Sequence, residues 1–397
     1  MGVPKLRFKA DDGSDFPDWT FRTFGSVVEE FNDRTTTENE DVLLSCAIDG
    51  MYLNSELFGH QRGASNIGYK KITKGALILS VQNLHLGNAN VNTRFEHGIV
   101  SPAYKTFHIV GCLTEFMSAW VKRHAARKFF YDATTVGASQ CRRNVDWEEL
   151  YQQTIAVPSP SEQRKIADLL SAVDDVISAQ EAEVAAWEKR KKGVMQKLFS
   201  QEVRFKADDG SDFPDWEEQK IEDVCVLNPR TEQLDDEFYY MDLGSIDHGR
   251  WEAPEIVNKV DAPSRAQRVA AIDDVFFQSV RPYNMGHYHY VAAKDKQVVA
   301  STGYIQARMR NGSNDFLYQL FYEERFNAEV NARCTGSNYP AINSRKFGEI
   351  TVALPSLPEQ RKIADCLSAL DDVVIKAKNE LAKWQELKKG LLQQMFV

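Results

Sequence analysis

The chain has 397 residues, with 48 Lys and Arg against 57 Asp and Glu, and a net charge of −9. This acidic balance argues against a free-standing nucleic-acid-binding domain, because such domains usually carry a basic excess. Hydrophobic residues make up 43% of the sequence, which is ample for buried globular cores. No apolar run approaches the roughly 18–20 residues that would cross a bilayer, so we expect no membrane association.

Cysteine spacing and the first residues indicate a cytoplasmic protein. The six cysteines contain no Cys-x-x-Cys pair, so we expect reduced thiols and neither a disulfide framework nor a zinc site. The opening stretch has no apolar core of the kind that export signals carry. We therefore expect a cytoplasmic location.

One sequence pattern occurs twice, at an offset of 197 residues. LRFKADDGSDFPDW at 6–19 returns as VRFKADDGSDFPDW at 203–216, and SEQRKIADLLSAVDD at 161–175 returns as PEQRKIADCLSALDD at 358–372. The segments between these blocks differ almost completely. Segment 20–150 holds 14 basic and 14 acidic residues, whereas 217–354 holds 15 and 21. The pattern predicts one scaffold built twice, with two different surfaces.

The first insert is predicted to be mixed α/β, with a strand at 76–81 and a helix at 122–131. The residues after this strand are rich in Gln, Asn and His, whose side chains bind bases in a DNA groove. Plain turns also use these residues, so both interpretations stay open. The candidate DNA-contacting residues in this insert are Gln82, Asn83, His85, Asn88, Arg94 and Tyr104.

A long helix is predicted from 161 to 199. Ser159 precedes Glu162 by three residues, which is a helix-start signal, and Pro160 suits the first turn. The apolar steps alternate four and three, as in a heptad seam. The predicted seam comprises Ile166, Leu170, Val173, Ile177, Val184, Trp187, Val194 and Leu198, interrupted at Gln180 and Lys191.

The second insert is predicted to repeat the first fold, with strands at 274–280 and 297–300 and a helix at 316–330. Arg281 and its neighbours occupy the place of the first insert's Gln/Asn segment, and arginine can bind guanine bidentately. The candidate DNA-contacting residues in this insert are Arg281, Tyr283, Asn284, His287, Tyr288, Tyr304, Asn338 and Tyr339.

A second long helix follows, with the same start signal, Ser356 three residues before Glu359, and with a matching seam. Its members are Ile363, Leu367, Leu370, Val374, Leu381, Trp384, Leu391 and Met395, interrupted at Ala377 and Lys388. Each helix could cover its own globular core, but two matched seams favour an antiparallel pair. Asp174-Asp175 and Asp371-Asp372 are expected on solvated helix faces, because adjacent helical residues point apart.

No catalytic constellation is present. There is no Gly-x-x-x-x-Gly-Lys-(Ser/Thr) phosphate loop, and Asn228-Pro229-Arg230 lacks the rest of the Asn/Asp-Pro-Pro-Tyr/Phe base-methylation motif. His287 and His289 share one strand face, but no further metal ligand is evident nearby, so we expect no metal site. We expect no catalytic activity from this chain alone.

The repeated blocks resemble the specificity subunit of type I restriction–modification systems over essentially the whole chain. The resemblance is strongest in Pro158 with Glu162-Gln163-Arg-Lys-Ile166-Ala167, and in Pro355 with Glu359-Gln360-Arg-Lys-Ile363-Ala364. Ser279-Val-Arg281-Pro-Tyr283 also resembles a segment frequent in the family's target-recognition domains. The first insert has Ser80-Val-Gln-Asn-Leu84 there, so a role for Arg281 does not transfer to it.

The resemblance implies an α+β fold: two similar mixed α/β target-recognition domains, separated by an antiparallel pair of long coiled-coil helices, with pseudo-two-fold symmetry. The implied domains are 1–157 and 203–354, and the conserved helical regions are 158–202 and 355–397. The implied function is non-catalytic reading of a split, asymmetric DNA target, with one half-site for each domain.

The implied partners are double-stranded DNA, two methyltransferase subunits and restriction subunits. No cofactor is expected on this chain: S-adenosylmethionine would bind the methyltransferase, and ATP and Mg²⁺ the restriction subunit. Modules about 10 bp apart, each reading about 4 bp, would leave a gap of about 6 bp. The alternatives are a non-enzymatic coiled-coil scaffold whose inserts bind proteins or glycans, and a stand-alone enzyme with an unrecognised site.

Overall fold

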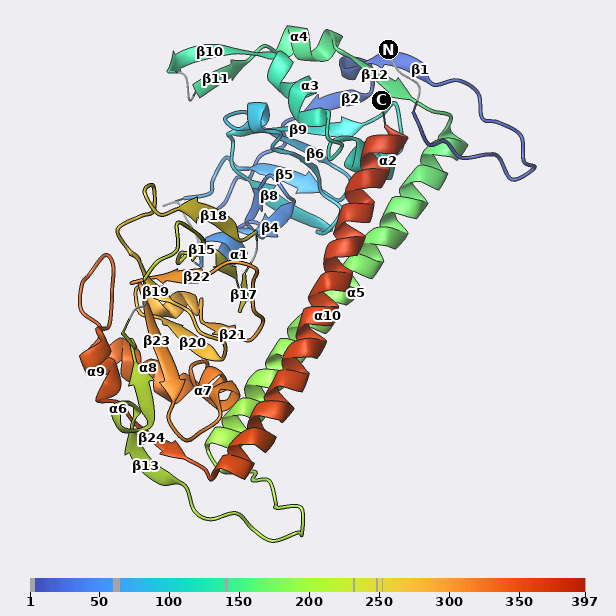
Figure 1. Ribbon diagram of the computed structural model, residues 1–397. Coiled ribbons are helices and arrows are strands. Elements are labelled where there is room, and N and C mark those ends of the chain that lie inside the picture. The colour runs from blue at the N-terminus through green and yellow to red at the C-terminus, as the bar shows by residue number, and fades with distance from the viewer. Residues whose placement is uncertain are drawn as a thin grey trace. The chain divides into compact units, whose positions relative to one another are not determined.

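The computed structural model describes residues 4–59, 65–139, 142–230, 233–247, 249–251 and 253–396. The chain forms two compact units (Figure 1). The first unit comprises Met1–Ala182 with Lys378–Val397, and the second comprises Glu183–Ala377. Two long helices, α5 (Pro160–Phe199) and α10 (Leu357–Met395), each contribute one end to either unit. Both helices were predicted from the repeated seams.

The first unit is built on a four-stranded antiparallel sheet with the order β2-β9-β6-β7. Strand β6 is buried along its whole length and confirms the strand predicted at 76–81. The helix predicted at 122–131 is present but begins later, at Ala126. The helix that precedes it was not predicted. The sheet strands and these helices are β2 (Val28–Phe31), β6 (Leu77–Ser80), β7 (Ala89–Val91), β9 (Tyr104–Ile109), α2 (Thr114–Trp120) and α3 (Ala126–Asp132).

Shorter elements complete the first unit. Two small antiparallel sheets, β3-β4 and β5-β8, enclose a separate apolar cluster. Strand β1 pairs with β12, which brings the end of the first repeat beside the start of α5. These elements are β1 (Thr20–Thr23), η1 (Phe24–Ser26), β3 (Leu44–Cys46), β4 (Met51–Leu53), α1 (Asn54–Phe58), β5 (Lys70–Thr73), η2 (Leu84–Leu86), β8 (His97–Val100), β10 (Thr134–Ser139), β11 (Arg142–Val145), α4 (Trp147–Gln152) and β12 (Thr154–Val157).

The second unit repeats this plan around the sheet β14-β23-β20-β21. The strands predicted at 274–280 and 297–300 are confirmed within two residues. The helix predicted at 316–330 is two helices, because the Glu323 carboxylate accepts from the amide of Phe326 and starts a new helix. The sheet strands and helices are β14 (Cys225–Leu227), β20 (Asp274–Gln278), β21 (Tyr288–Tyr290), β23 (Tyr304–Met309), α7 (Asn314–Leu320) and α8 (Glu324–Arg333).

A second four-stranded sheet, β18-β15-β22-β19, is larger than its counterpart in the first unit. Strand β13 pairs with β24 as β1 pairs with β12. The remaining elements are β13 (Glu217–Lys220), α6 (Ile221–Val224), β15 (Glu237–Met241), β16 (Ile246–Asp247), β17 (Arg250–Trp251), β18 (Glu255–Asn258), β19 (Ala266–Val269), η3 (Pro282–Asn284), β22 (Val298–Ser301), α9 (Ser344–Gly348) and β24 (Thr351–Leu354). The predicted fold class, two similar mixed α/β domains with a pair of long helices, is confirmed.

Within each unit the two long helices run antiparallel and join the globular core. In the first unit, Ile166 and Leu170 of α5 share a buried cluster with Leu392 and Met395 of α10. In the second, Met195 and Leu198 of α5 share one with residues 363–367 of α10. Both predicted roles of the apolar seams are therefore found together. Each helix end covers the core of a unit and also packs against the other long helix.

The buried residues of the two seams follow the predicted pattern, except that the buried position moves by one residue towards the C-terminal end of each helix. Val173, Val184 and Val374 are buried, whereas Ile177, Trp187, Leu370, Leu381 and Trp384 are half-buried. Towards the helix ends, Met195 and Leu392 are buried in place of the predicted Val194 and Leu391. The drift of a 3.6-residue helix against a 3.5-residue repeat accounts for this shift. Ala377 was expected to interrupt the seam, but it is buried.

The two lysines that interrupt the seams form matched ion pairs between the helices. Lys191 Nζ lies 2.5 Å from Asp371 Oδ1, and Lys388 Nζ lies 2.5 Å from Asp174 Oδ1. Both pairs join residues at the same places in the repeat. The expectation of a solvated face is therefore wrong for Asp371, which lies against the partner helix, whereas Asp174 is half exposed and Asp175 and Asp372 are exposed as predicted.

These pairs should differ in strength because they differ in exposure. The side chains of Lys191 and Asp371 are 18% and 30% exposed, against 31% and 50% for Lys388 and Asp174. We expect Lys191→Met to lower the free energy of unfolding by about 1 kcal/mol, and Lys388→Met by less than about 0.5 kcal/mol. Urea unfolding of both variants checks this order. Equal losses would show that exposure does not set the strength of these pairs.

Candidate nucleic-acid interface

Five candidate residues of the second unit come together on its surface. Arg281, Tyr283 and Asn284 follow strand β20, and Asn338 and Tyr339 lie in a turn closed by the Thr335–Ala341 bridge. Arg281 joins the two segments, because its backbone N–H donates to the Pro340 carbonyl at 2.7 Å. We call these five residues the Arg281 cluster.

The guanidinium of Arg281 is held by an aromatic ring and not by an acid. Its Cζ lies 4.3 Å from the centre of the Tyr339 ring. Among the residues that the structure describes, no carboxylate forms an ion pair with it. Stacking on a ring leaves the edges of a guanidinium available for a bidentate partner. Tyr339 and Tyr283 are 65% and 55% exposed, so the cluster presents aromatic and hydrogen-bonding groups to solvent.

The backbone beneath the cluster is fixed by Gln278, which sequence analysis missed. Its buried amide donates to the Val280 carbonyl and accepts from the Gly286 N–H, both at 2.9 Å. Arg281 has a φ of +52°, a left-handed conformation that costs free energy outside glycine. The hydrogen bonds of Gln278 on either side hold that conformation. The only sequence signal for this role was a polar residue inside an apolar strand.

Of three other candidates in the second unit, two are buried and one is half-buried. His287 and Tyr304 are 0% exposed, and the Tyr304 hydroxyl donates to the Asp242 carbonyl at 3.0 Å. Tyr288 is half-buried against Trp251, with ring centres 6.0 Å apart. His287 and Tyr304 were wrongly chosen, because the sequence pattern did not show which face of each strand meets the core. Tyr288 remains a weaker candidate.

His287 should make the stability of the second unit depend on pH. Burial lowers the pKa of this imidazole to about 3, from the usual 6.5. Its Nδ1 accepts from the Gln278 backbone N–H at 3.1 Å, so the folded state keeps the ring neutral. The unfolded chain binds a proton below pH 6.5, so stability is present above that pH and is lost as the pH falls towards 3. The expected slope is about 1.4 kcal/mol per pH unit.

The comparison of pH 7 with pH 5 in urea unfolding tests this dependence. His287→Gln keeps an acceptor but no titrating ring, so its stability should change less between these two pH values. An identical pH slope in the two proteins would contradict the prediction.

Three of the candidates predicted in the first unit are exposed: Gln82, Asn83 and Arg94. Arg94 forms a bidentate pair with Glu56, at 2.7 and 2.9 Å. His85 is half-buried in η2. The structure therefore does not gather these candidates into one cluster as it does in the second unit.

Asn88 and Tyr104 serve the interior of the first unit. Asn88 is 5% exposed and its amide donates to the Cys46 carbonyl at 3.0 Å. The Tyr104 hydroxyl reaches the same carbonyl at 3.5 Å. Burial removes Asn88 from the candidates, and Tyr104 is half-buried. Sequence analysis also missed Arg143, whose Cζ lies 4.1 Å from the Tyr131 ring centre, a second arginine–tyrosine stack.

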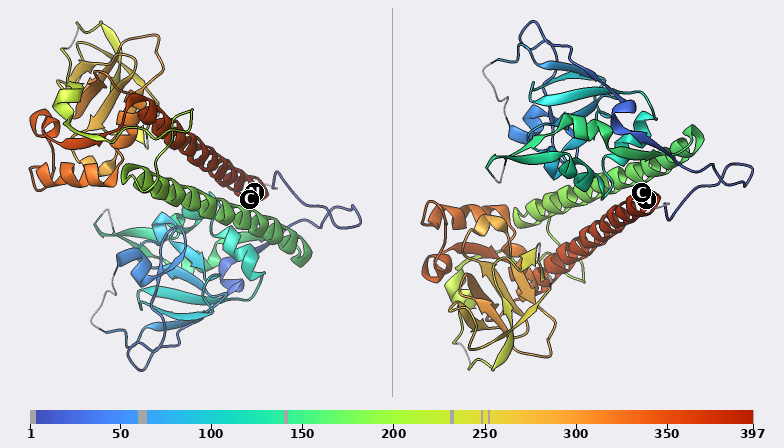
Figure 2. Two further views of the ribbon diagram at one scale, coloured as in Figure 1. Left: turned by 90° about the horizontal axis from the view of Figure 1, so that it is seen from below. Right: turned by 90° about the horizontal axis from the view of Figure 1, so that it is seen from above.

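Each repeat is tied to the start of a long helix by the same buried ion pair. Arg7 donates to both carboxylate oxygens of Glu162, at 3.0 and 2.8 Å, and the Trp19 indole donates at 3.1 Å. Arg204 and Trp216 bind Glu359 with nearly identical geometry. Figure 2 shows the first copy of the repeat, the dark blue loop at 6–19, beside the first turns of α5. The Glu-Gln pairs of the repeated blocks are thus structural anchors.

The glutamine next to each anchor links the helix to the recognition fold. Gln163 donates to the Pro158 carbonyl at 2.8 Å and accepts from the Leu113 N–H at 2.7 Å. Gln360 makes the matching bonds with Pro355 and Ser313, both at 2.9 Å. The repeated sequence is therefore explained by one joint that is built twice.

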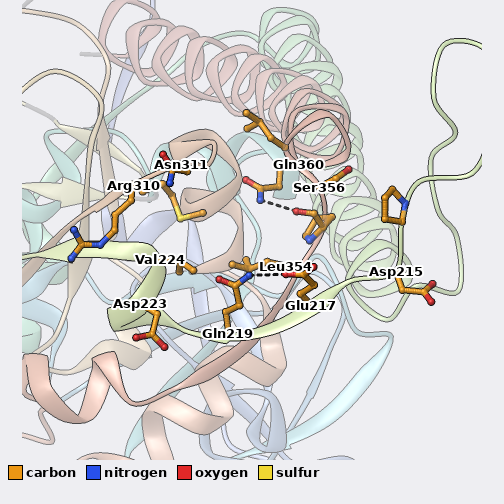
Figure 3. A pocket seen from close by; sticks show the side chains of 14 residues that line it. Asp215, Glu217, Gln219, Asp223, Val224, Arg310, Asn311, Leu354, Ser356 and Gln360 are labelled. Atoms are coloured by element: carbon orange, nitrogen blue, oxygen red, sulfur yellow. Dashed lines mark hydrogen bonds between the residues drawn. The ribbon is translucent and has the colours of Figure 1, made fainter.

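A cavity of about 450 Å³ lies at this joint in the second unit (Figure 3). Gln219 and Glu217 of β13 are hydrogen-bonded at its wall, at 3.1 Å. In the first unit Arg22 takes the place of Gln219, and its guanidinium donates to the Gly111 carbonyl at 3.1 Å. None of the described residues that line the cavity is a nucleophile hydrogen-bonded to a base.

Ser356 lines the same cavity and corrects one prediction. Its hydroxyl has no hydrogen-bond partner in the described structure, whereas the Ser159 hydroxyl accepts from the Glu162 N–H at 3.4 Å. Pro160 is the first residue of α5, as predicted, and Leu357 begins α10. The serine start signal therefore holds for α5 and fails for α10.

In the described residues we find no group of three or more potential metal ligands. Across that same part of the chain, none of the helices combines the length and apolar character that a bilayer span requires.

The chain is similar to type I restriction specificity subunits. Residues 214–384 match the family model of the type I restriction modification DNA specificity domain. The type I restriction enzyme MjaVIII specificity subunit of Methanocaldococcus jannaschii is 24% identical over 258 residues, covering 60% of this chain and 61% of that protein. The putative MjaX specificity subunit of the same organism is 22% identical, covering 85% and 76%.

Solved structures share the fold. The S subunit of a type I restriction-modification system from M. genitalium has a TM-score of 0.57 at 16% identity, covering 100% of this chain and 99% of its own. A chain from a study of type I R-M complex assembly and conformational transition has a TM-score of 0.53 at 16% identity, covering 95% and 97%. The family model thus matches most of the second unit, and the whole chain has the fold of solved type I restriction-modification S subunits.

Proposed function

We propose that this chain is the DNA-reading subunit of a type I restriction–modification complex, with one half of a split, asymmetric target read by each unit. The single observation that carries the proposal is one recognition fold built twice with different surfaces. The second unit presents the Arg281 cluster, whereas the first presents Gln82, Asn83 and the Arg143–Tyr131 stack. Unlike surfaces on like folds favour two different half-sites.

The chain would guide catalysis done elsewhere. Two methyltransferase subunits would bind S-adenosylmethionine, and restriction subunits would use ATP and Mg²⁺. Shared DNA contacts account for the net charge of −9, because partner subunits can supply most of the phosphate contacts. Work on DNA with these partners implies a cytoplasmic location. A coiled-coil scaffold for proteins or glycans is not favoured, since the relatives are specificity subunits.

The long helices would set the spacing of the half-sites. Two similar modules on DNA lie about 10 bp apart, centre to centre. If each module reads about 4 bp, the gap between the half-sites is about 6 bp. Adding a whole helical turn to both α5 and α10 should lengthen the gap and leave both half-sites unchanged. A changed half-site with an unchanged gap would contradict this role.

Single-molecule methylation mapping tests the main proposal. DNA from cells that express this chain with its methyltransferase should carry methylated adenine in one asymmetric, two-part motif. Cells that express the methyltransferase alone are the control and should lack that motif. Methylation that is unaffected by the chain, or confined to one uninterrupted motif, would overturn the proposal.

A further inference from the structure

The first unit contains a buried arginine, Arg123, that has no acidic partner among the described residues. Arg123 lies between α2 and α3 and is 8% exposed. Its Nη1 donates to the Trp120 carbonyl at 3.2 Å, and its Cζ lies 3.7 Å from the Trp120 ring centre. Its Nε–H has no partner among the described residues. Burial lowers the pKa of the guanidinium to about 9. A buried charged donor that is left unpaired is costly and requires an explanation.

A cavity of about 130 Å³ lies beside this arginine. It is lined by Arg123, His124 and Ala125 from the recognition fold and by Leu392, Gln393 and Phe396 from the end of α10. This volume exceeds the roughly 30 Å³ that one water occupies in the liquid. Among the described residues, no carboxylate lines the cavity, although a guanidinium and an amide do.

The matching place in the second unit contains a carboxylate of the chain itself. Gln196 matches Gln393 in the repeat, and Glu324 takes the place of His124 at the turn between the two helices. Gln196 Nε2 donates to Glu324 Oε2 at 2.8 Å, and Lys192 Nζ lies 3.6 Å from the same oxygen. In the first unit, Lys389, which matches Lys192, lies 3.5 Å from Glu386 of its own helix. The first unit keeps the amide and the lysine, and His124 stands where the second unit has Glu324.

We propose that this cavity in the first unit is a binding site for a small oxyanion of carboxylate or phosphate chemistry. The Arg123 guanidinium, which lines the cavity, supplies a charge-assisted hydrogen bond, and the Gln393 amide supplies a neutral one. The bound oxygens take the place that Glu324 fills in the second unit. Two sources can supply such a group: a free ion, or an acidic side chain of a partner subunit.

Titration calorimetry of the full chain with inorganic phosphate, in chloride buffer at constant ionic strength, tests the site. We expect binding at one site and a loss of affinity of about tenfold or more in Arg123→Met, because the charged donor is removed. Gln393→Leu should also weaken binding and covers the case in which Arg123→Met does not fold. Arg190→Met is the matched control, since Arg190 also lies over a tryptophan, Trp187, at 5.2 Å, but outside the cavity.

A second arm separates the two sources. The titration is repeated on the chain assembled with its methyltransferase subunit. Retained phosphate binding points to a free ion, and lost binding points to an acidic side chain of the partner; both support an oxyanion site. Equal phosphate affinity in the wild type, Arg123→Met and Gln393→Leu would overturn the proposal, as would no phosphate binding by the free chain.

Discussion

Replacing Glu359 by alanine should lower the free energy of unfolding of the second unit by about 3 kcal/mol. The carboxylate is 0% exposed and accepts three hydrogen bonds, two from Arg204 and one from Trp216. Removal of one member of a buried ion pair typically costs about 3–5 kcal/mol. We expect the lower end of this range because the Arg204 side chain is 24% exposed, so water can hydrate its guanidinium once the carboxylate is removed.

Native-state hydrogen exchange resolves which unit loses stability. Protection should fall in 183–377 for Glu359→Ala, and in the first unit for the matched variant Glu162→Ala, whose geometry is the same. Glu386→Ala removes a carboxylate that is 74% exposed and should change stability by less than about 0.5 kcal/mol. A loss spread equally over both units in either buried variant would contradict a local anchor.

The repeat predicted where each recognition fold joins a long helix, but not which contacts form there. The 197-residue offset located the Glu-Gln blocks, the two long helices and the doubled fold. It did not show that Arg7 reaches Glu162, because that contact joins residues 155 positions apart. Local pattern carries helix periodicity and start signals, whereas an ion pair between distant segments depends on the tertiary path of the chain.

The candidate site was predictable only in part, for a related reason. A polar or aromatic residue in a strand faces either the core or solvent, and a shift of one position reverses the face. His287 and Tyr304 look as suitable in sequence as Tyr283 and Tyr339, yet the first two are buried and the last two are exposed. Arg143 was missed because its partner Tyr131 comes from a preceding helix.

Replacing Arg281 by alanine should relax the target at one base pair of one half-site. This expectation rests on the proposed reading of DNA. Arg281 is stacked on Tyr339, free of described acidic partners and held in a left-handed conformation by the bonds of its neighbours. A bidentate arginine–guanine contact discriminates against the wrong base by about 1–3 kcal/mol, so the preference at that position should fall roughly 5- to 150-fold.

Methylation mapping of the variant complex gives the measurement, because it reports both half-sites in the same molecules. Tyr339→Ala should produce a weaker form of the same defect, since the guanidinium loses its stacking surface, and Tyr339→Phe should preserve the wild-type motif. Arg345→Ala is the charge-matched control: its side chain is 88% exposed and lies by Glu349 of its own turn. If the wild type yields a two-part motif and Arg281→Ala leaves every position unchanged, Arg281 is not a reading residue. Relaxation of both half-sites would instead show a general loss of DNA affinity, because a residue that contacts one base pair alters only that position.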